Sequence, residues 1–199
     1  LAGSSDMFGA DCRSGNFVAA HDGFTLADAV ADAHRHNHAN GEDTRDGQGG
    51  EVSWNNGAEG PTADPAVNAR RAADVRALLG CLFASTGTIL LSAGDEFGRS
   101  QRGNNNAYAQ DNPLTWLDWE GRDRALEDHV AMLAARRAGR GGAFSRFPEG
   151  GDWLAPDGQP MTVADWENPA SDGFTFRSAD PALPRRLHIR RAARVVDWE

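Results

Sequence analysis

The sequence predicts an α/β fold, with two strand–helix units of a parallel (β/α)8 barrel followed by a β-rich segment. Two apolar runs each lead into acidic residues, a long polar loop and a helical pattern, which is the order of elements in such a barrel. After about residue 140, glycine and proline divide the chain into short pieces separated by aromatic residues, which is typical of β-structure. The 199 residues fall short of the roughly 250 that a complete barrel needs.

The first strand is expected at 17–20, and it ends in His21, Asp22 and Gly23. Burying an imidazole and a carboxylate without partners is costly, so we expect this pair where a strand end opens into a site. The alternative is that Asp22 caps the turn and that His21 is an ordinary residue of the rim. A short helical pattern follows at 26–30.

Residues 34–62 form a long polar loop rich in Asn, Gly, Asp and Glu, and loops of that length are usually functional or disordered. Within it, His34, His36 and His38 raise the alternative of a zinc-binding module. A zinc site needs further ligands and an ordered outer shell, which an Asn/Gly-rich loop does not predict. We therefore expect neither a metal nor a cofactor.

Regular structure resumes with a helix whose N-cap is Asp64 and whose first residue is Pro65, a strong helix start signal. Apolar residues then recur at helical spacing as far as Phe83. Gly87 is the expected stop of this helix.

A second buried strand is expected at 88–93, and it leads into Asp95 and Glu96. A polar loop at 99–122 and a helix at 123–138 complete the second unit. In a parallel barrel the carboxyl ends of neighbouring strands lie on one face, where sites are built. The two acidic strand ends therefore predict a carboxylate-lined site.

Composition excludes several classes of partner. The formal net charge of −9 and the pI of about 5.1 argue against nucleic acid, since phosphate binding needs clustered positive charge. No run approaches the roughly 18 apolar residues of a membrane span. Cys12 and Cys81 fit no disulfide framework, and the first residues do not resemble a signal peptide. We expect a cytoplasmic protein that contacts neither nucleic acid nor membrane.

The polar loops combine carboxylates, amides and Trp side chains, which is the chemistry of sugar binding. Asp, Glu, Asn and Arg pair with neighbouring sugar hydroxyls, and aromatic rings pack against the apolar faces of sugars. For any single Trp, however, ordinary packing is the favoured interpretation.

Several distinct motifs follow one another along the chain: LAGSSD at 1–6, NFVAAHDGFTL at 16–26, HNHANGE at 36–42, RDG at 45–47, SWNNGAEGPT at 53–62, AGDEFGR at 93–99, GNNNAY at 103–108, QDN at 110–112 and WLAPDGQPMTVADW at 153–166. In this order they closely resemble the bacterial glycogen debranching enzymes, an isoamylase-type group in the α-amylase superfamily of glycoside hydrolases. The resemblance covers roughly residues 1–170.

The resemblance implies that 17–22 and 88–96 are the seventh and eighth strands of the catalytic (β/α)8 TIM barrel. Residues 1–140 would then be the C-terminal part of that barrel, and residues 141–199 the start of a C-terminal β-domain. The implied activity is retaining hydrolysis of α-1,6-glucosidic branch linkages in glycogen or another branched α-glucan. The family's aspartate nucleophile and glutamate acid/base lie upstream of the matched part, in the remainder of the barrel.

By the same resemblance, Asp22 would be the family's third carboxylate, which hydrogen-bonds the glucose at the scissile bond, and His21 would bind the same ring. Such hydrogen bonds strengthen as the sugar flattens toward an oxocarbenium-like transition state. Asp95 and Glu96 would serve as loop and subsite scaffolding rather than as the hydrolytic pair. Substrate contacts are expected from polar and aromatic loop residues: Trp54, Asp95, Glu96, Arg99, Asn106 and Asp111.

The C-terminal tail departs from the family's pattern. It holds five arginines, at positions 185, 186, 190, 191 and 194, which predict a solvated amphipathic or poorly ordered end rather than an anion-binding arm. A second hypothesis, of another class, is that the chain is a non-catalytic α-glucan-binding fragment, because the hydrolytic pair is not found in it.

Overall fold

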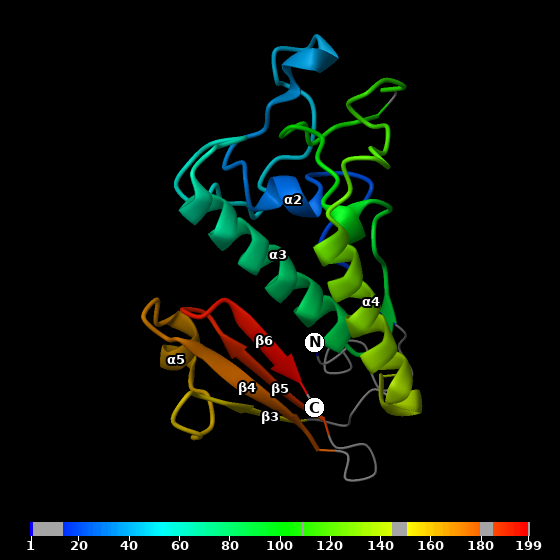
Figure 1. The fold of residues 1–199 in the computed structure, drawn as a ribbon. Helices are drawn as coiled ribbons and strands as arrows, with labels where there is room; N and C mark the ends of the chain where they lie inside the picture. Colours follow the sequence, from blue (N-terminus) through cyan, green and yellow to red (C-terminus); the bar gives the residue numbers. More distant parts are fainter. Residues whose placement is uncertain (2–13, 109, 145–150, 180–184, 199) are drawn as a thin grey trace. The chain divides into compact units, whose positions relative to one another are not determined.

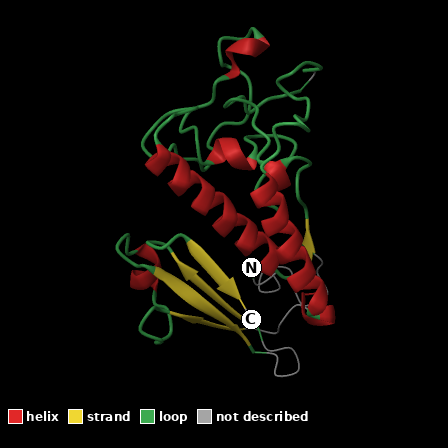
Figure 2. Ribbon diagram, in the orientation of Figure 1, coloured by secondary structure: helices red, strands yellow, loops and turns green. Residues whose placement is uncertain are grey.

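The computed structural model describes residues 1, 14–108, 110–144, 151–179 and 185–198 (Figure 1). Most of the loop expected at 1–16, with its LAGSSD motif and Cys12, lies outside the described residues. Helices and strands are both present, so the expected mixture of helix and sheet is confirmed (Figure 2). The chain forms two compact units, which we call the sheet unit (Leu1–Asn16, Ala77–Ile89 and Leu133–Glu199) and the loop unit (Phe17–Arg76 and Leu90–Met132).

The two long helices, α3 (Pro65–Ala84) and α4 (Arg124–Gly139), confirm the helices expected from the apolar periodicity. The α3 helix begins where its capping signal predicts. The Asp64 carboxylate accepts hydrogen bonds from the backbone N–H groups of Ala66 and Val67, at 2.8 and 3.3 Å. Local capping chemistry therefore sets this helix start.

Three short helices lie in the loop unit: α2 (Leu26–Ala29) and the 3₁₀ helices η1 (Asn37–Asn40) and η2 (Asp95–Phe97). Thr25 caps α2, because its hydroxyl accepts a hydrogen bond from the Asp28 N–H at 3.2 Å. The apolar core of the unit is small and consists of Phe24, Leu26, Val30, Val67, Val75, Phe97, Leu126 and Val130.

The strands expected at 17–20 and 88–93 are wrong in position and length. The observed strands are β1 (Gly15–Asn16) and β2 (Thr88–Ile89), which form a parallel pair. Phe17, expected inside a buried strand, is 57% exposed. A parallel strand that is buried on both faces needs neighbours at both edges, and in the described chain β1 and β2 have only each other.

The sheet unit holds a four-stranded antiparallel sheet of order β3-β4-β5-β6. The tail arginines lie in and beside its strand β5, which has exposed Arg186 and Arg190 at its two ends. The solvated amphipathic alternative therefore fits this strand, and the poorly ordered alternative is wrong for it. The elements are η3 (Gly141–Phe144), β3 (Gly151–Leu154), α5 (Val163–Glu167), β4 (Gly173–Ser178), β5 (Arg186–Arg190) and β6 (Val195–Trp198).

One face of this sheet forms an aromatic core. Phe176, Leu187 and Trp198 are paired across β4, β5 and β6, and each is 2% exposed. The ring of Phe176 lies 4.6 Å from that of Trp153, and Trp198 meets Phe144 edge-on at 5.4 Å. Burying each large side chain contributes about 1.5–3 kcal/mol, so this cluster supplies much of the unit's stability.

The end of α3 is closed by a side chain from α4. The Arg137 guanidinium donates to the carbonyls of Phe83, Ser85 and Gly87, at 2.6, 2.7 and 2.7 Å. Carbonyls at a helix C-terminus lack partners within the helix, so this arginine replaces the simple glycine stop that the sequence predicts.

Candidate functional site

The predicted pair of His21 and Asp22 lies on the surface, between β1 and α2 in the chain. The two side chains are 91% and 70% exposed, and the imidazole Nε2 lies 3.3 Å from the carboxylate Oδ2. Neither side chain has a further hydrogen bond or ion pair within the described chain. Both are therefore open to a ligand.

The turn after this pair is held by distant loops. The Gly23 N–H donates to the Asn105 carbonyl at 3.1 Å, and the Phe24 N–H donates to Glu51 Oε1 at 2.8 Å. Glu51 also accepts a hydrogen bond from the Asn105 side-chain amide. Gly23 has a φ of +90°, and a Cβ there would lie 2.2 Å from Glu51, so only glycine fits. The position of the exposed pair thus depends on Asn105 and Glu51.

Asparagine side chains join the two long polar loops. The fully buried Asn37 accepts from the Asn105 N–H at 2.9 Å and donates to the Asn105 side-chain oxygen at 2.8 Å. Asn40 donates to the Asn106 carbonyl at 2.9 Å and accepts from the Asn104 amide at 2.7 Å. We call these five residues the asparagine network. Its matched donors and acceptors order the loops without long helices or strands.

Asn106, a predicted substrate-binding residue, is itself bound within this network. Its side-chain amide donates to Asp46 Oδ2 at 2.9 Å, and the same oxygen accepts from Asn40 at 2.6 Å. Hydrogen bonds from Asn40 and then Asn106 lower the pKa of Asp46 below its ordinary value. Substrate contact by Asn106 stays a prediction.

Trp54 and Asp111, two other predicted substrate-binding residues, each take part in a hydrogen bond donated by a tryptophan ring. The Trp54 ring N–H donates to Asp74 at 2.8 Å, and Asp111 accepts from the ring N–H of Trp116 at 2.9 Å. Trp54 and Trp116 are 37% and 60% exposed. A ring fixed through its N–H but still exposed can pack against an apolar sugar face. These contacts remain predictions as well.

Glu96 and Arg99 bind the protein's own chain. The Glu96 carboxylate accepts from the Gly94 N–H at 2.8 Å. Arg99 donates to the Ala93 carbonyl at 3.3 Å and to the Gln101 side chain. Both side chains therefore bind the loop after β2, and the roles expected of Glu96 and Arg99 toward a substrate stay predictions.

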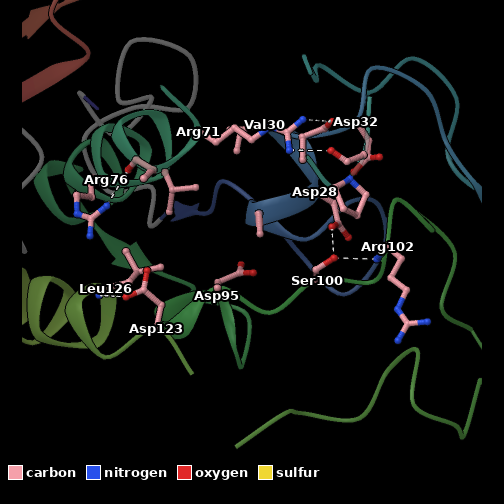
Figure 3. Close-up of a pocket in the computed structure, with 17 residues that line it drawn as sticks. Asp28, Val30, Asp32, Arg71, Arg76, Asp95, Ser100, Arg102, Asp123 and Leu126 are labelled. Carbon is pink, nitrogen blue, oxygen red and sulfur yellow. Dashed lines mark hydrogen bonds between the residues drawn. The ribbon is translucent and has the colours of Figure 1, made fainter. Parts of the chain in front are cut away.

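A cavity of about 260 Å³ lies within the loop unit, with walls from α2, α3 and α4 (Figure 3). The buried Asp28 lines it, and its carboxylate accepts from the Ser100 hydroxyl at 2.6 Å and the Gln101 N–H at 2.7 Å. Burial raises the pKa of Asp28, although these hydrogen bonds act in the opposite direction.

Asp95 also lines this cavity and is only 2% exposed. One carboxylate oxygen accepts from the Leu26 N–H at 3.1 Å, and the other has no hydrogen-bond partner among the described residues. Burial raises the pKa of Asp95 to about 6, against the opposing effects of that hydrogen bond and of the Arg99 charge. Asp95 is therefore an interior carboxylate, unlike the exposed Asp22.

Comparison with curated proteins finds relatives whose names all refer to glycogen. A glycogen debranching enzyme of Pectobacterium atrosepticum is 47% identical over 176 residues, which cover 84% of this chain and 27% of that protein. Another, of Enterobacter sp., is 45% identical over 184 residues, with the same coverages of 84% and 27%. A glycogen operon protein GlgX homologue of Mycobacterium tuberculosis is 43% identical over 184 residues, covering 83% of this chain and 26% of that protein. By sequence, the chain is a homologue of the glycogen debranching enzymes.

The resemblance to glycogen debranching enzymes noted in the sequence is thus confirmed. The chain spans about a quarter of the length of these relatives. No family model matches the chain. None of the described helices is both long and apolar enough to cross a membrane.

Sequence reasoning missed several buried charged residues around the cavity. Asp28 and Asp32 both line the cavity and lie four residues apart, a spacing that could have drawn attention to them. Arg71, on α3, is also buried, and its guanidinium donates to main-chain carbonyls. No local signal marks Arg71, because its partners belong to a loop that precedes it.

Proposed function

We propose that the chain forms part of a hydrolase that cuts α-1,6-glucosidic branch linkages of glycogen or another branched α-glucan in the cytoplasm. The observation that carries this proposal is the 43–47% identity to proteins named for glycogen debranching and the glycogen operon. The exposed His21 and Asp22 support it, because both side chains can reach a ligand. The exposed rings of Trp54 and Trp116 suit a sugar polymer.

We also propose that β1 and β2 are the seventh and eighth strands of a (β/α)8 barrel. They are parallel, and α3 lies between them in the chain, as in a barrel unit. In this proposal residues 1–140 belong to the barrel and 141–199 begin a C-terminal β-domain. The exposed Phe17 would then be covered by other parts of the barrel.

In the proposed reaction, a carboxylate attacks the anomeric carbon while a carboxylic acid protonates the branch oxygen, and water then releases the glycosyl group with retained configuration. These two carboxyl groups are proposed for the part of the longer relatives that the chain does not match. Asp22 accepts hydrogen bonds from hydroxyls of the reacting glucose, and His21 contacts the same ring. Since neither side chain is engaged elsewhere in the described chain, this binding breaks no other hydrogen bond.

The test is Asp22→Asn in a full-length polypeptide that carries this segment. The amide is a weaker acceptor for hydroxyls that bear developing charge, so we expect turnover on glycogen to fall about 10²–10³-fold. Glu120→Gln, at an exposed position, is the control and should retain turnover. Reducing ends released from glycogen measure both. Normal debranching by the Asp22→Asn protein would contradict the assignment.

The 199-residue chain by itself provides a second arm of this test. Incubated with glycogen, it should release no linear chains, because the proposed nucleophile and acid lie elsewhere. Retention on immobilised glycogen without hydrolysis would favour the alternative of a glucan-binding fragment for the chain alone. Release of linear chains would refute the proposed division of roles.

A further inference from the structure

Three ligand-type side chains converge in the loop unit, apart from the exposed pair. Asp32, His36 and Glu59 each offer one nitrogen or oxygen, and these atoms all lie within 4.8 Å of one another. The His36 Nε2 is 2.9 Å from Glu59 Oε1 and 3.6 Å from Asp32 Oδ1. Neither His34 nor His38 belongs to this cluster, so the histidine run of the sequence does not itself form the group.

Glu59 is held in place by the main chain. Its carboxylate accepts from the N–H groups of Ala33 and His34, each at 3.0 Å, and from the Asn55 amide at 3.0 Å. These donors orient the carboxylate before any ligand arrives. Outer hydrogen bonds of this kind are what position metal ligands in proteins.

Asp32 lacks such support. Its side chain is only 4% exposed, and no hydrogen bond reaches its carboxylate from the residues that the structure describes. Its polar neighbours are the His36 ring and the charge of Arg71, whose N–H groups go to main-chain carbonyls. Burying an unpaired carboxylate is costly, so a cation beside Asp32 would stabilise its charged form.

Gly103 closes the cluster from the other polar loop. The His36 N–H donates to the Gly103 carbonyl at 2.7 Å, which fixes the backbone beside the ring. A Cβ at Gly103 would lie 2.6 Å from the His36 ring and 2.8 Å from Asp32 Oδ1. The two ligands therefore occupy the space beside a glycine that no side chain can fill.

We propose that Asp32, His36 and Glu59 bind a divalent metal ion of the zinc type. An imidazole with two carboxylates is a donor set for such an ion, and its two negative charges balance the metal. Ligand atoms about 2.0–2.2 Å from one tetrahedral ion lie roughly 3.3–3.6 Å apart. The 3.6 Å between His36 and Asp32 fits this spacing, and the 2.9 Å between His36 and Glu59 has to widen slightly when the ion binds. His36 and Glu59 are 39% and 30% exposed, which leaves an entry path and room for a water ligand.

Zinc titration of the metal-free, untagged 199-residue chain by calorimetry tests the proposal. We expect one zinc per chain, and at least a tenfold weaker affinity in His36→Gln and in Asp32→Asn. His34→Gln and His38→Gln are matched controls that should change affinity less than twofold. Circular dichroism checks that each variant folds. Absence of stoichiometric zinc, or equal losses in His34→Gln and His36→Gln, would overturn the proposal.

A second measurement does not depend on the variants. Cobalt bound to the unsubstituted chain should give a visible absorption band that zinc abolishes by competition at one equivalent. A cobalt spectrum identical to that of the free ion would refute the site even if the His36→Gln chain failed to fold. The proposal is independent of hydrolysis, so loss of debranching activity bears on neither outcome.

Discussion

The loop unit and the sheet unit are stabilised by different kinds of interaction. In the loop unit, side-chain amides, carboxylates and a buried guanidinium bind main-chain groups of neighbouring loops. In the sheet unit, strand pairing is backed by aromatic packing of Phe176 and Trp198. Polar bonds depend on direction and on each partner, whereas apolar contacts are non-directional. The loop unit should therefore respond more sharply to single polar substitutions and to pH.

The difference suits the proposed activity. Loops that must present His21 and Asp22 to a polymer cannot cover them with apolar packing, so their order has to come from hydrogen bonds beneath them. The asparagine network supplies these bonds and ends at Gly23, directly after the exposed pair. The sheet has no such demand, and its apolar face is buried.

Replacing Arg71 by alanine should produce the largest effect. The buried guanidinium donates to the carbonyls of Gly60 and Asn55 at 2.8 and 3.0 Å, and also to those of Ala31 and Ala58. Removing it leaves several buried acceptors unpaired, so we expect a loss of about 4 kcal/mol in the free energy of unfolding. Urea denaturation measures this loss, and hydrogen exchange should locate it in the loop unit.

The matched control for this change is Arg124→Ala. Arg124 is 70% exposed and forms an ion pair with Glu127 at 3.3 Å, so its loss should change stability by about 0.5 kcal/mol or less. If Arg71→Ala were no more harmful than this control, the claim that polar bonds stabilise the loop unit would fail.

The helices could be predicted because their ends depend on neighbouring residues in the chain. The strands could not, because their bounds depend on pairing with residues far away in the sequence. Asp64 marks the start of α3 through bonds to its nearest neighbours in the chain. The boundaries of β1 and β2 depend instead on a partner more than 70 residues away, since Gly15 pairs with Thr88. No local pattern could reveal that the apolar residues after Asn16 have no second neighbouring strand among the residues that the structure describes.

The carboxylates of the candidate site also show what local sequence can and cannot predict. His21 and Asp22 were expected at an open strand end; they are exposed but lie beyond the end of β1, and their role in a site stays a prediction. Asp95 follows an apolar run just as Asp22 does, yet it is buried against the Leu26 N–H. The sequence shows where a carboxylate follows an apolar run, but only the tertiary fold decides whether water reaches it.

Asn37→Ala should have the next largest effect, and this effect should be confined to the loop unit. The change removes the acceptor of the buried Asn105 N–H and two hydrogen bonds donated by Asn37, to Asn105 and to the Asp46 carbonyl. We expect a loss of about 3 kcal/mol. Hydrogen exchange should accelerate at 36–48 and 103–106, while β4 and β5 keep their protection.

Asn68→Ala is the matched control, because the hydrogen bond that the Asn68 side-chain amide donates to the Thr62 carbonyl, at 2.9 Å, is exposed. Its cost should stay near 0.5 kcal/mol, at the low end for a hydrogen bond. Equal acceleration of exchange in the sheet strands of the Asn37→Ala chain would show that the asparagine network does not act locally, and the comparison of the two units would lose its basis.

Asp95→Asn should have the smallest effect, one that appears only as a change in pH dependence. Burial raises the pKa of Asp95 from 3.8 to about 6, so its contribution to stability is complete below pH 3.8 and is lost as pH rises through about 6. Two pKa units correspond to at most about 3 kcal/mol of lost stability across this window.

In Asp95→Asn, the new side chain keeps an oxygen that accepts from the Leu26 N–H but cannot ionise. The variant therefore separates the effect of the Asp95 charge from the effect of this hydrogen bond. Unfolding free energies measured from pH 3.5 to 7 should therefore fall less steeply in Asp95→Asn than in the unsubstituted chain. Asp32, whose pKa burial also raises to about 6, keeps a residual slope in both proteins. Asp95→Ala, which removes the acceptor too, should show the same flattened slope at lower stability throughout. Identical slopes with and without the Asp95 carboxyl would mean that the interior of the loop unit is as well hydrated as its surface.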